Sequence, residues 1–460
     1  MTDGPDLGEL AALYRDLHAH PELAFAEHRT AGIVAERLRE LGYQVTTGVG
    51  GTGVVGVLAH GTGPTVLLRA DMDGLPVLEQ TGLPYASTGR AKDPDVPVMH
   101  ACGHDMHVTC LLGAAADLAA QAREGAWHGT LLLVFQPAEE VGKGAQAMID
   151  DGLYARFPVP DIVLGQHVMP LPAGVLGVHG GAAMAGADAL QVVLHGKGGH
   201  GSRPETTVDP VLMAAATVLR LQGIVSREVA ARDTAVVTVG ALRAGTAPNI
   251  IPDQAELLLS LRSYDDKVRD ALRAAIGRII RAESAASGAP KDPEITTTIS
   301  FPVLVNDPAA CARLTEAFNA GVGLTLDPGP VTGSEDVGLL ATAAGVPCVY
   351  WFLGCSDPAL FTGVTTIEEA RGVVDSLPSN HSPLFAPVVE PTIRTGIAAL
   401  TAAARTWLLP PGETATLSSG GRPPYPPYPP VPGLARPMAR TAIVSGAQAG
   451  PDYGINQRPR

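Results

Sequence analysis

The chain has 460 residues, of which 46% are hydrophobic and 17% are charged, and its formal net charge is −14. This composition is globular, and the length predicts two or three domains. The acidic excess argues against a nucleic-acid partner, because phosphate binding needs clustered Lys and Arg. No apolar run reaches the ~18 residues of a membrane span, and the start MTDGPDLGEL lacks the apolar stretch of a signal peptide. We therefore expect no membrane partner.

The cysteines carry information about the compartment. They number five, which is odd and small for this length, and they show no disulfide-framework spacing. A reduced, cytoplasmic setting fits this pattern best. They are Cys102, Cys110, Cys311, Cys348 and Cys355.

The first part of the chain predicts an α/β fold. Helical patterns cover residues 7–17, 30–41 and 108–122. Short apolar runs typical of buried strands lie at residues 54–58, 65–69, 131–135 and 162–164. Because buried apolar strands that alternate with helices indicate a sheet covered on both faces, we predict a mixed, mostly parallel sheet flanked by helices.

The pattern changes near residue 187. Alternating strand patterns and helices then follow in the order β-α-β-β-α-β, which is the split βαβ order of a ferredoxin-like domain. We therefore predict that residues 187–298 form an inserted α+β lid, and that residues 1–186 and 299–409 form one discontinuous catalytic domain. The expected elements are strands at 189–195, 235–242, 255–263 and 295–301, helices at 208–229 and 265–287, and beyond the lid a strand at 347–353 and a helix at 391–409.

Residues 410–460 form a proline-rich tail. The segment GRPPYPPYPPVPG cannot continue a helix or donate along a sheet ladder. We expect disorder with polyproline II character. A dispensable tail is the main interpretation. A docking peptide for an aromatic-lined groove is the alternative.

Three predicted strands end in polar clusters. Asp71 and Asp73 follow residues 65–69, the pair Glu139-Glu140 follows residues 131–135, and His167 follows residues 162–164. In open α/β sheets, sites form outside the carboxyl ends of the strands. Acids and a histidine at three such ends therefore predict one shared site.

A further cluster, HACGHD, stands at the entry to the helix at 108–122. Cys102 and His104 within it are good ligands for zinc or another transition metal. Alone, a Cys-x-His pair is weak evidence, since buried Cys and satisfied core His are common. His381 is another candidate ligand that alone reads as a loop histidine. Together with the strand ends, these residues favour a metal site.

The adjacent acids Glu139 and Glu140 suit two different tasks. Two consecutive carboxylates after a strand point to different sides, so one can bind metal while the other acts as a general base. The alternative, a pair of solvated acids, conflicts with the buried run LLLVFQPA that precedes them.

With these residues in hand, the chain resembles the metallo-aminoacylase and carboxypeptidase superfamily. The similarity is to its amidohydrolase branch of hippurate hydrolases, N-acyl-amino-acid amidohydrolases and indole-acetyl-amino-acid hydrolases. The matching segments occur in the family's order over residues 13–409. They are LHAHPELAFAE, LLRADMDGLP, MHACGHDMH, VFQPAEE, GQHV, GKGGHGSRPE, APNIIPD, TGSEDVG and NHSPLFAP.

The resemblance implies a dinuclear site for two divalent ions, zinc or manganese. Glu139 falls at the family's general base, and Asp73 at the acid that orients a ligand histidine. Asp71 is given no role. The implied metal ligands are Cys102, His104, Glu140, His167 and His381.

The resemblance also implies substrate contacts from the lid, partly across a homodimer. His200 falls at the position that stabilises the oxyanion. Asn249 and Arg262 fall at positions that bind the amino-acid part of the substrate, and a guanidinium suits a carboxylate because it offers two parallel donors. The alternatives are a surface strand charge for Arg262 and a solvent-exposed loop residue for His200, although the three glycines beside His200 suggest a tight turn or the close approach of a ligand.

The expected activity is metal-dependent amidohydrolysis at a carbon–nitrogen bond other than a peptide bond. Glu139 would activate a metal-bound water to cleave an N-acyl amino acid. A dipeptidase or carboxypeptidase using the same site is the first alternative. A non-catalytic binding protein that acts through the proline-rich tail is the remote one, because an inactive relative would be expected to have lost ligands.

Overall fold

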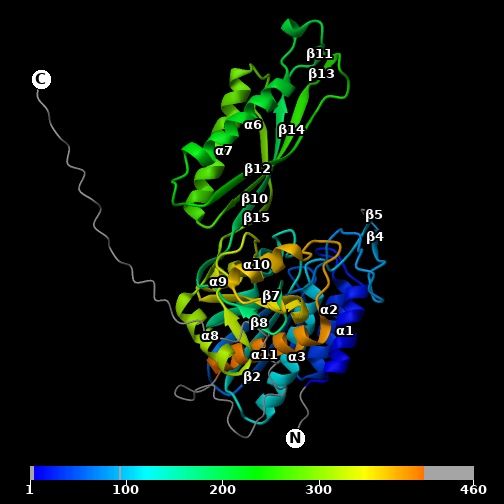
Figure 1. Ribbon diagram of the computed structural model, residues 1–460, viewed down its shortest axis with the longest axis vertical. Coiled ribbons are helices and arrows are strands. Elements are labelled where there is room, and N and C mark those ends of the chain that lie inside the picture. The colour runs from blue at the N-terminus through cyan, green and yellow to red at the C-terminus, as the bar shows by residue number, and fades with distance from the viewer. Residues whose placement is uncertain (1–4, 93–94, 409–460) are drawn as a thin grey trace, which may run out of the picture.

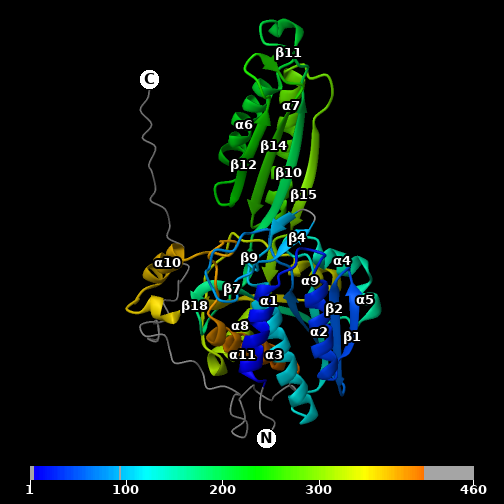
Figure 2. The same ribbon diagram turned by 90° about the vertical axis from the view of Figure 1, so that its right-hand side faces the viewer.

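The computed structural model describes residues 5–92 and 95–408, so the predicted proline-rich tail lies outside the described residues. The described chain has two parts, an α/β body and an elongated inserted unit (residues 186–301) that projects from it (Figures 1 and 2). None of the described helices combines the length and apolar character needed to cross a bilayer.

The body is built on an eight-stranded sheet in the order β1-β2-β6-β3-β7-β18-β8-β17. Strands β6, β3, β7 and β18 run parallel to their neighbours in this central group, whereas β1, β2 and β8 introduce antiparallel pairs. The predicted mixed, mostly parallel sheet is therefore confirmed. The strands are β1 (Gln44–Val49), β2 (Gly53–His60), β3 (Thr65–Asp71), β6 (Gly129–Gln136), β7 (Ile162–Pro172), β8 (Val175–Gly177), β17 (Leu324–Leu326) and β18 (Cys348–Ser356).

Helices cover both faces of this sheet because its central strands are apolar at successive positions. Leu68 and Leu133 belong to one core, and Leu67 and Leu132 to the core on the opposite face. The first core holds α1 (Leu7–Ala19), α2 (His28–Glu40), α3 (His104–Arg123), α8 (Pro308–Gly321) and α11 (Val389–Leu408). The second holds α4 (Gly144–Asp150), α5 (Leu153–Arg156) and α9 (Val337–Ala344), and α10 (Ile367–Ser376) packs on a small separate cluster.

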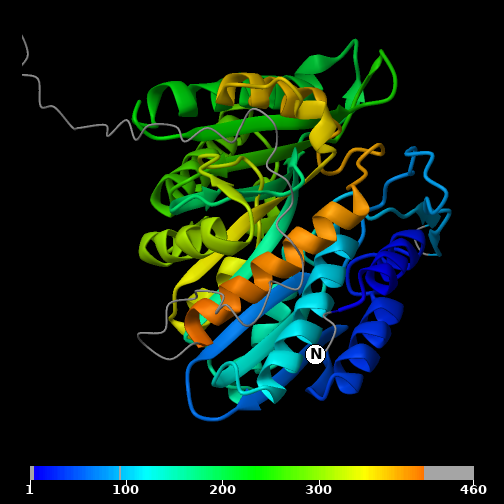
Figure 3. The ribbon, with the colours of Figure 1, turned by 60° about the horizontal axis from the view of Figure 1, so that its bottom comes forward.

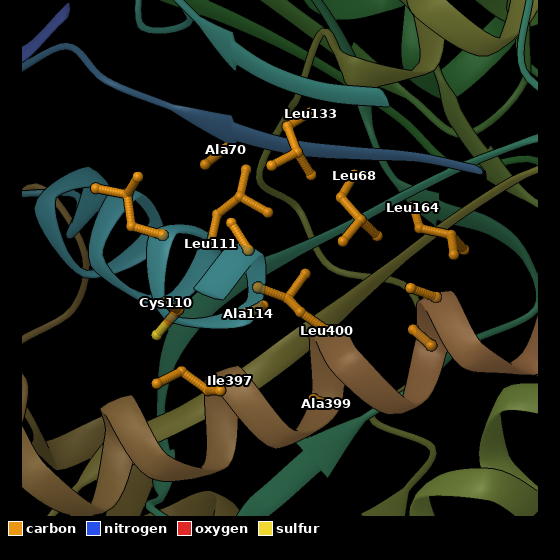
Figure 4. Packing of buried hydrophobic residues seen from close by; sticks show 14 of the residues in the cluster. Leu68, Ala70, Cys110, Leu111, Ala114, Leu133, Leu164, Ile397, Ala399 and Leu400 are labelled. Carbon is orange, nitrogen blue, oxygen red and sulfur yellow. The ribbon is translucent and has the colours of Figure 1, made fainter. Parts of the chain in front are cut away.

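Helices α3 and α11 lie side by side in the first core, as Figure 3 shows in cyan and orange. Ala114 on α3 and Ile397 and Leu400 on α11 pack below Leu68 of the sheet (Figure 4). Gly113 lies at the contact, where an added Cβ would come within 2.4 Å of Ile397 Cδ1. The close approach of the two helices therefore depends on a residue without a side chain.

The inserted unit has the β-α-β-β-α-β order that the sequence predicts. Its antiparallel sheet has the order β12-β14-β10-β15, and α6 and α7 pack on it through a core of their own. Its division from a catalytic domain at residues 187 and 298 stays a prediction. The elements are β10 (Gly186–His195), α6 (Pro210–Arg227), β12 (Ala235–Ala244), β14 (Gln254–Ser263), α7 (Asp266–Ala286) and β15 (Glu294–Phe301).

Small elements complete the described chain. Three two-stranded pairs are formed by β4 (Arg90–Lys92) with β5 (Asp95–Pro97), β9 (Gly181–Met184) with β16 (Leu304–Asn306), and β11 (Gly199–His200) with β13 (Ile250–Ile251). Short 3₁₀ helices cover Pro204–Thr206 and Pro358–Phe361. All five cysteines are free and buried.

Replacing Gly113 with alanine should destabilise the body, although alanine is the better helix former. The added Cβ would collide with Ile397, so we expect a loss of about 1–3 kcal/mol in the free energy of unfolding, measured by urea titration. Gly372→Ala in α10 is the control, since a Cβ there meets no atom within 4 Å and should add about 0.5–1 kcal/mol. Equal effects of the two variants would contradict the packing argument.

Candidate metal centre

Three strands bring acids and a histidine to one edge of the sheet. Asp73 follows β3, Glu139 and Glu140 follow β6, and His167 lies on β7. The sequence predicts a strand that ends at residue 164, but β7 continues to Pro172 and keeps its pairing with β18, where His167 lies opposite Phe352. Pairing of β7 with β3 stops at Gly165. His167 therefore lies just beyond the last residue of β7 that pairs with β3.

The turn before α3 supplies Cys102, and the first residue of the helix is His104. Between them, Gly103 has φ 86°, and a Cβ there would lie 2.4 Å from Val168 Cγ2. Only glycine combines this conformation with so close a contact. The turn thereby places the thiol and the imidazole on the same side.

His381 comes from a loop at the mouth of the site. Its φ is 71°, an uncommon value for a residue with a side chain, and its N–H donates to Ala101 O at 2.8 Å. The preceding Asn380 donates to Cys102 O and to Val168 O, both at 3.1 Å. The loop is thus attached to the turn before α3 and to β7. Sequence reasoning missed Asn380, although NHSPLFAP contains it.

The five predicted ligands converge. Cys102 Sγ lies 3.4 Å from His167 Nε2, and Glu140 Oε2 lies 3.3 Å from His381 Nε2. Glu140 Oε1 lies 3.7 Å from His104 Nε2. Donor atoms of Cys102, Glu140 and His381 all lie within 4.8 Å of one another, as do those of Cys102, His104 and His167. Thiolate, imidazole and carboxylate together form a donor set that suits zinc or another divalent transition metal.

Two atoms of this cluster lack a partner. His104 Nε2 and Glu140 Oε1 are buried and accept no hydrogen bond among the described residues. Buried polar atoms without partners are rare in folded proteins, and each needs a ligand or water. His167 donates from Nδ1 to Val168 O at 2.8 Å, which leaves Nε2 with a lone pair. The residues therefore fit bound cations.

The charges of the cluster lead to the same conclusion. Burial raises the pKa of Glu140 to about 7. Burial, together with Glu140 and Glu139, raises the pKa of the Cys102 thiol. Burial would lower the pKa of His104, but Asp71, Asp73 and Glu140 outweigh it and raise that pKa to about 10. The fold thus holds acidic groups that need positive charge nearby.

Asp73 contacts both halves of the site. Its Oδ1 lies 3.3 Å from His104 Nδ1. The same carboxylate accepts the backbone N–H of Glu139 at 3.1 Å and that of Glu140 at 3.0 Å. One side chain therefore orients an imidazole and anchors the turn that carries the two acids.

A buried ionic network that sequence reasoning missed lies behind the cluster. The Arg69 side chain has no solvent exposure, and it donates to Asp71 at 2.7 Å and to Glu335 at 2.8 Å. It also contacts Asp336 at 3.3 Å. The sequence carries two signals of this network. One is a charged residue inside the apolar strand LLRAD, and the other is the pair of acids in TGSEDVG. A buried arginine needs several acidic partners, and these motifs supply them.

Glu139 faces this network. Its carboxylate lies within 4.8 Å of those of Glu335 and Asp336, and Glu139 Oε2 is 3.9 Å from His104 Nε2. Burial, then Glu335 and Glu140, raise the pKa of Glu139 well above its usual range. A carboxyl group in such surroundings binds a proton more readily than a solvated one, which is a property expected of a general base.

The predicted residues of the inserted unit separate into two groups. Arg262 lines a cavity of about 680 Å³ together with Cys102 and Glu139, and it donates to Thr332 O and, at 3.1 Å, to Ser334 Oγ. His200 is the second residue of β11 and Asn249 immediately precedes β13; both are exposed and lie at the far end of the unit (Figure 1). Within one chain, the structure does not bring them to the cluster.

Replacing Arg69 with methionine should cost about 3–5 kcal/mol in the free energy of unfolding, because three buried acids lose their counter-ion. Burial already raises the pKa of Asp336 to about 8 despite Arg69. An acid whose pKa is raised by folding destabilises the fold once it is deprotonated, so the deficit should be larger at pH 8 than at pH 6. Urea titrations at both pH values measure this.

Arg220→Met is the control for that experiment. Arg220 pairs with Glu283 at 3.3 Å on the surface, and 69% of its side chain is exposed. Its loss should change stability by less than about 0.5 kcal/mol at either pH. A comparable, pH-independent effect of both substitutions would show that the network carries no buried charge.

Comparison with known proteins agrees with this geometry. A protein named hippurate hydrolase from Campylobacter jejuni is 40% identical over 351 residues, which cover 75% of this chain and 88% of that protein. Thermostable carboxypeptidase 1 from Saccharolobus solfataricus is 37% identical over 74% of this chain and 84% of its own length.

Solved structures show the same fold. The crystal structure of the Bacillus subtilis YXEP protein, described as a dinuclear metal binding peptidase from the M20 family, has a TM-score of 0.68 and 29% sequence identity. It covers 87% of this chain and 98% of that one. The family model for Peptidase family M20/M25/M40 matches residues 67–369. The chain belongs to peptidase family M20/M25/M40.

Proposed function

We propose that the chain is a metal-dependent amidohydrolase that cleaves the amide bond of an N-acyl amino acid, with Glu139 as the general base. The observation that carries the proposal is the convergence of five donor side chains around two buried atoms without partners, His104 Nε2 and Glu140 Oε1. The names of two similar proteins, a hippurate hydrolase and a dinuclear metal binding peptidase, support the same chemistry.

Two divalent ions would be held by the predicted ligands. When bound, they supply Lewis acidity that lowers the pKa of a water molecule and polarises the amide carbonyl. His104 and His167 would bind through Nε2, because their Nδ1 atoms are engaged by Asp73 and by Val168 O. These contacts would hold each imidazole in one tautomer. The ligand set is Cys102, His104, Glu140, His167 and His381.

Glu139 would move the proton. Its carboxylate takes a proton from the attacking water and delivers it to the amide nitrogen that leaves. The surrounding acids favour the protonated form between these two transfers. Asp73 holds the backbone N–H of Glu139, so the carboxylate starts from a constrained position. This arrangement separates the base from its neighbour Glu140, which would bind metal.

The cavity offers a cation for the substrate carboxylate. Arg262 lines it, and its guanidinium could exchange its contacts with Thr332 and Ser334 for two parallel bonds to a carboxylate. Asp188 also lines the cavity, but its carboxylate is engaged by Arg269 in two bonds of 2.8 Å. Apart from Glu139 and Glu140, which have other proposed roles, the described lining residues therefore leave no carboxylate for a free amino terminus.

This absence favours an N-acyl amino acid over a dipeptide. A dipeptidase or carboxypeptidase remains the second candidate, because a carboxypeptidase is among the relatives. Hydrolysis rates on a panel of N-acyl amino acids and unblocked dipeptides, measured with defined metals, distinguish the two. A clear preference for dipeptides would reject the amidohydrolase proposal.

A homodimer formed through the inserted unit would explain where His200 acts. The edge strand β12 is unpaired on one side, and it exposes Val236 and Leu242. On α6, Leu212 and Leu219 are 70% and 76% exposed. An unpaired edge beside an apolar helix face is typical of an interface. We propose that this interface brings His200 and Asn249 of one subunit to the metal cluster of the other.

Glu139→Gln should keep both metal ions but lose several orders of magnitude in kcat, because an amide cannot accept the proton. Cys102→Ser should instead lose metal, since it removes a thiolate ligand. Elemental analysis and initial rates on the same preparations separate the two effects. A rate near wild type for Glu139→Gln would reject Glu139 as the base, and unchanged metal content in Cys102→Ser would reject Cys102 as a ligand.

The dimer can be tested by mixing two inactive variants, His200→Ala and Glu139→Gln. Subunit exchange should restore one intact site in each mixed dimer, so activity should return to about a quarter of the wild-type value if closed twofold dimers form at random. Adding Leu219→Glu to both variants should prevent this recovery. If mixing restores nothing while both variants are dimeric in light scattering, His200 does not act across the interface.

A further inference from the structure

Two residues with side chains adopt left-handed backbone conformations on either side of one buried acid. Phe25 has φ 59° and Ala138 has φ 51°. For a residue with a Cβ this region is disfavoured, so such positions persist only where surrounding contacts hold them. Both residues donate their backbone N–H to the same atom, Glu27 Oε1, at 3.0 Å from Phe25 and 2.8 Å from Ala138.

Both carboxylate oxygens of Glu27 accept hydrogen bonds. It has no solvent exposure, and the Thr52 hydroxyl donates to its other oxygen, Oε2. Glu27 stands at the N-cap position of α2, yet its side chain makes no cap hydrogen bond to that helix. A buried carboxylate would normally cost free energy, and here its oxygens are used to hold a distant turn.

The turn that Glu27 holds carries the proposed base, Glu139, and the proposed metal ligand, Glu140. Ala138 immediately precedes Glu139 and Glu140, whose N–H groups both go to Asp73. Three consecutive backbone amides are thus bound by two carboxylates from other parts of the chain. Asp73 accepts the N–H groups of Glu139 and Glu140. Glu27 accepts the N–H group of Ala138, the residue whose left-handed backbone is the least favourable of the three.

We propose that Glu27 is a positioning residue that holds Ala138 in the left-handed conformation and thereby directs Glu139 and Glu140 toward the metal cluster. The proposal rests on the proposed function for the roles of those two acids. Glu27 belongs to the segment LHAHPELAFAE, which otherwise has no part in the mechanism. It touches neither substrate nor metal in this assignment and acts only through the turn.

The same segment provides a matched control in Glu22. Its carboxylate accepts N–H groups from Arg29 and Thr30 at 2.9 Å, at the start of α2. It makes no side-chain contact with the turn at Ala138. Glu22→Ala therefore removes an acid that stabilises the beginning of the helix and leaves the turn intact, whereas Glu27→Ala removes the contact with Ala138.

The conservative variant and a second-site change sharpen the test. Glu27→Gln should behave nearly as the wild type, since its amide oxygen can accept both N–H groups while its amide nitrogen donates to Thr52 Oγ1. Ala138→Gly should have little effect alone. The double variant with Glu27→Ala should bind Mn²⁺ about fivefold more tightly than Glu27→Ala alone, because glycine adopts the left-handed region without the penalty that alanine carries.

The first measurement is amide hydrogen exchange, by mass spectrometry, on metal-stripped protein. We expect faster exchange in the peptide that contains Ala138 for Glu27→Ala, but not for Glu22→Ala or Glu27→Gln. Titration calorimetry with Mn²⁺ and kcat measurements follow. Glu27→Ala should bind Mn²⁺ about tenfold more weakly, as expected when a residue that orients a ligand is lost, and kcat should fall with little change in KM.

Unchanged exchange at Ala138 in Glu27→Ala would overturn the proposal, as would equal losses in Glu22→Ala. A loss of Mn²⁺ affinity without any recovery by Ala138→Gly would exclude Ala138 as the link. Failure of the proposed function is distinguishable, because it would appear in the wild-type protein as absence of Mn²⁺ binding or of amide hydrolysis. The exchange measurement still decides the role of Glu27 in that case.

Discussion

The carboxyl edge of the main sheet buries acidic groups in excess of the basic groups available to them. Asp71, Glu335 and Asp336 share the single guanidinium of Arg69. Glu139 and Glu140 have no guanidinium partner among the described residues and lie near the imidazoles of His104 and His381, and burial raises the pKa of each acid. An arrangement of this kind is stable only if protons or cations supply the missing positive charge. The donor set around His104 would hold the two divalent ions that we propose, so the proposed chemistry follows from a charge imbalance built into the fold.

The proposed site draws its residues from two parts of the fold, the edge of the main sheet and the inserted unit. Four of the proposed metal ligands lie at or just after strands β6 and β7 or at the start of the buried helix α3, which are parts of an α/β fold that hold side chains firmly, and the fifth, His381, lies on a loop attached to them. The inserted unit brings Arg262 to the cavity but leaves His200 at its far end. A site assembled from the body of one subunit and the tip of another would form completely only in the dimer that we propose.

Much of the fold was predictable because its strands and helices carry clear periodicities. The apolar runs at β3 and β6 and the long helices α3 and α11 are of this kind. The extension of β7 past residue 164 was not predictable, since GQHVMP is not an apolar run and beyond Gly165 it is held in the sheet by pairing with β18. The convergence of strand-end residues follows from the topology of parallel strands.

The contacts that support the site were beyond local sequence reasoning. Arg69 and Glu335 are 266 residues apart, and Glu27 and Ala138 are 111 residues apart, so neither pair leaves a local pattern. A left-handed conformation at Ala138 cannot be inferred from alanine, which normally avoids it. The separate roles of Glu139 and Glu140 came from the family resemblance, and the structure adds that their side chains face different groups, Glu335 and His381.

The most direct test of the central claim is anomalous diffraction from crystals grown with Mn²⁺ and a non-hydrolysable N-acyl amino acid analogue. The account predicts two anomalous peaks, both within ligand distance of atoms from Cys102, His104, Glu140, His167 and His381, with Glu139 unliganded and facing the amide carbon. A single peak elsewhere, or Glu139 bound to metal with Glu140 facing the substrate, would contradict it.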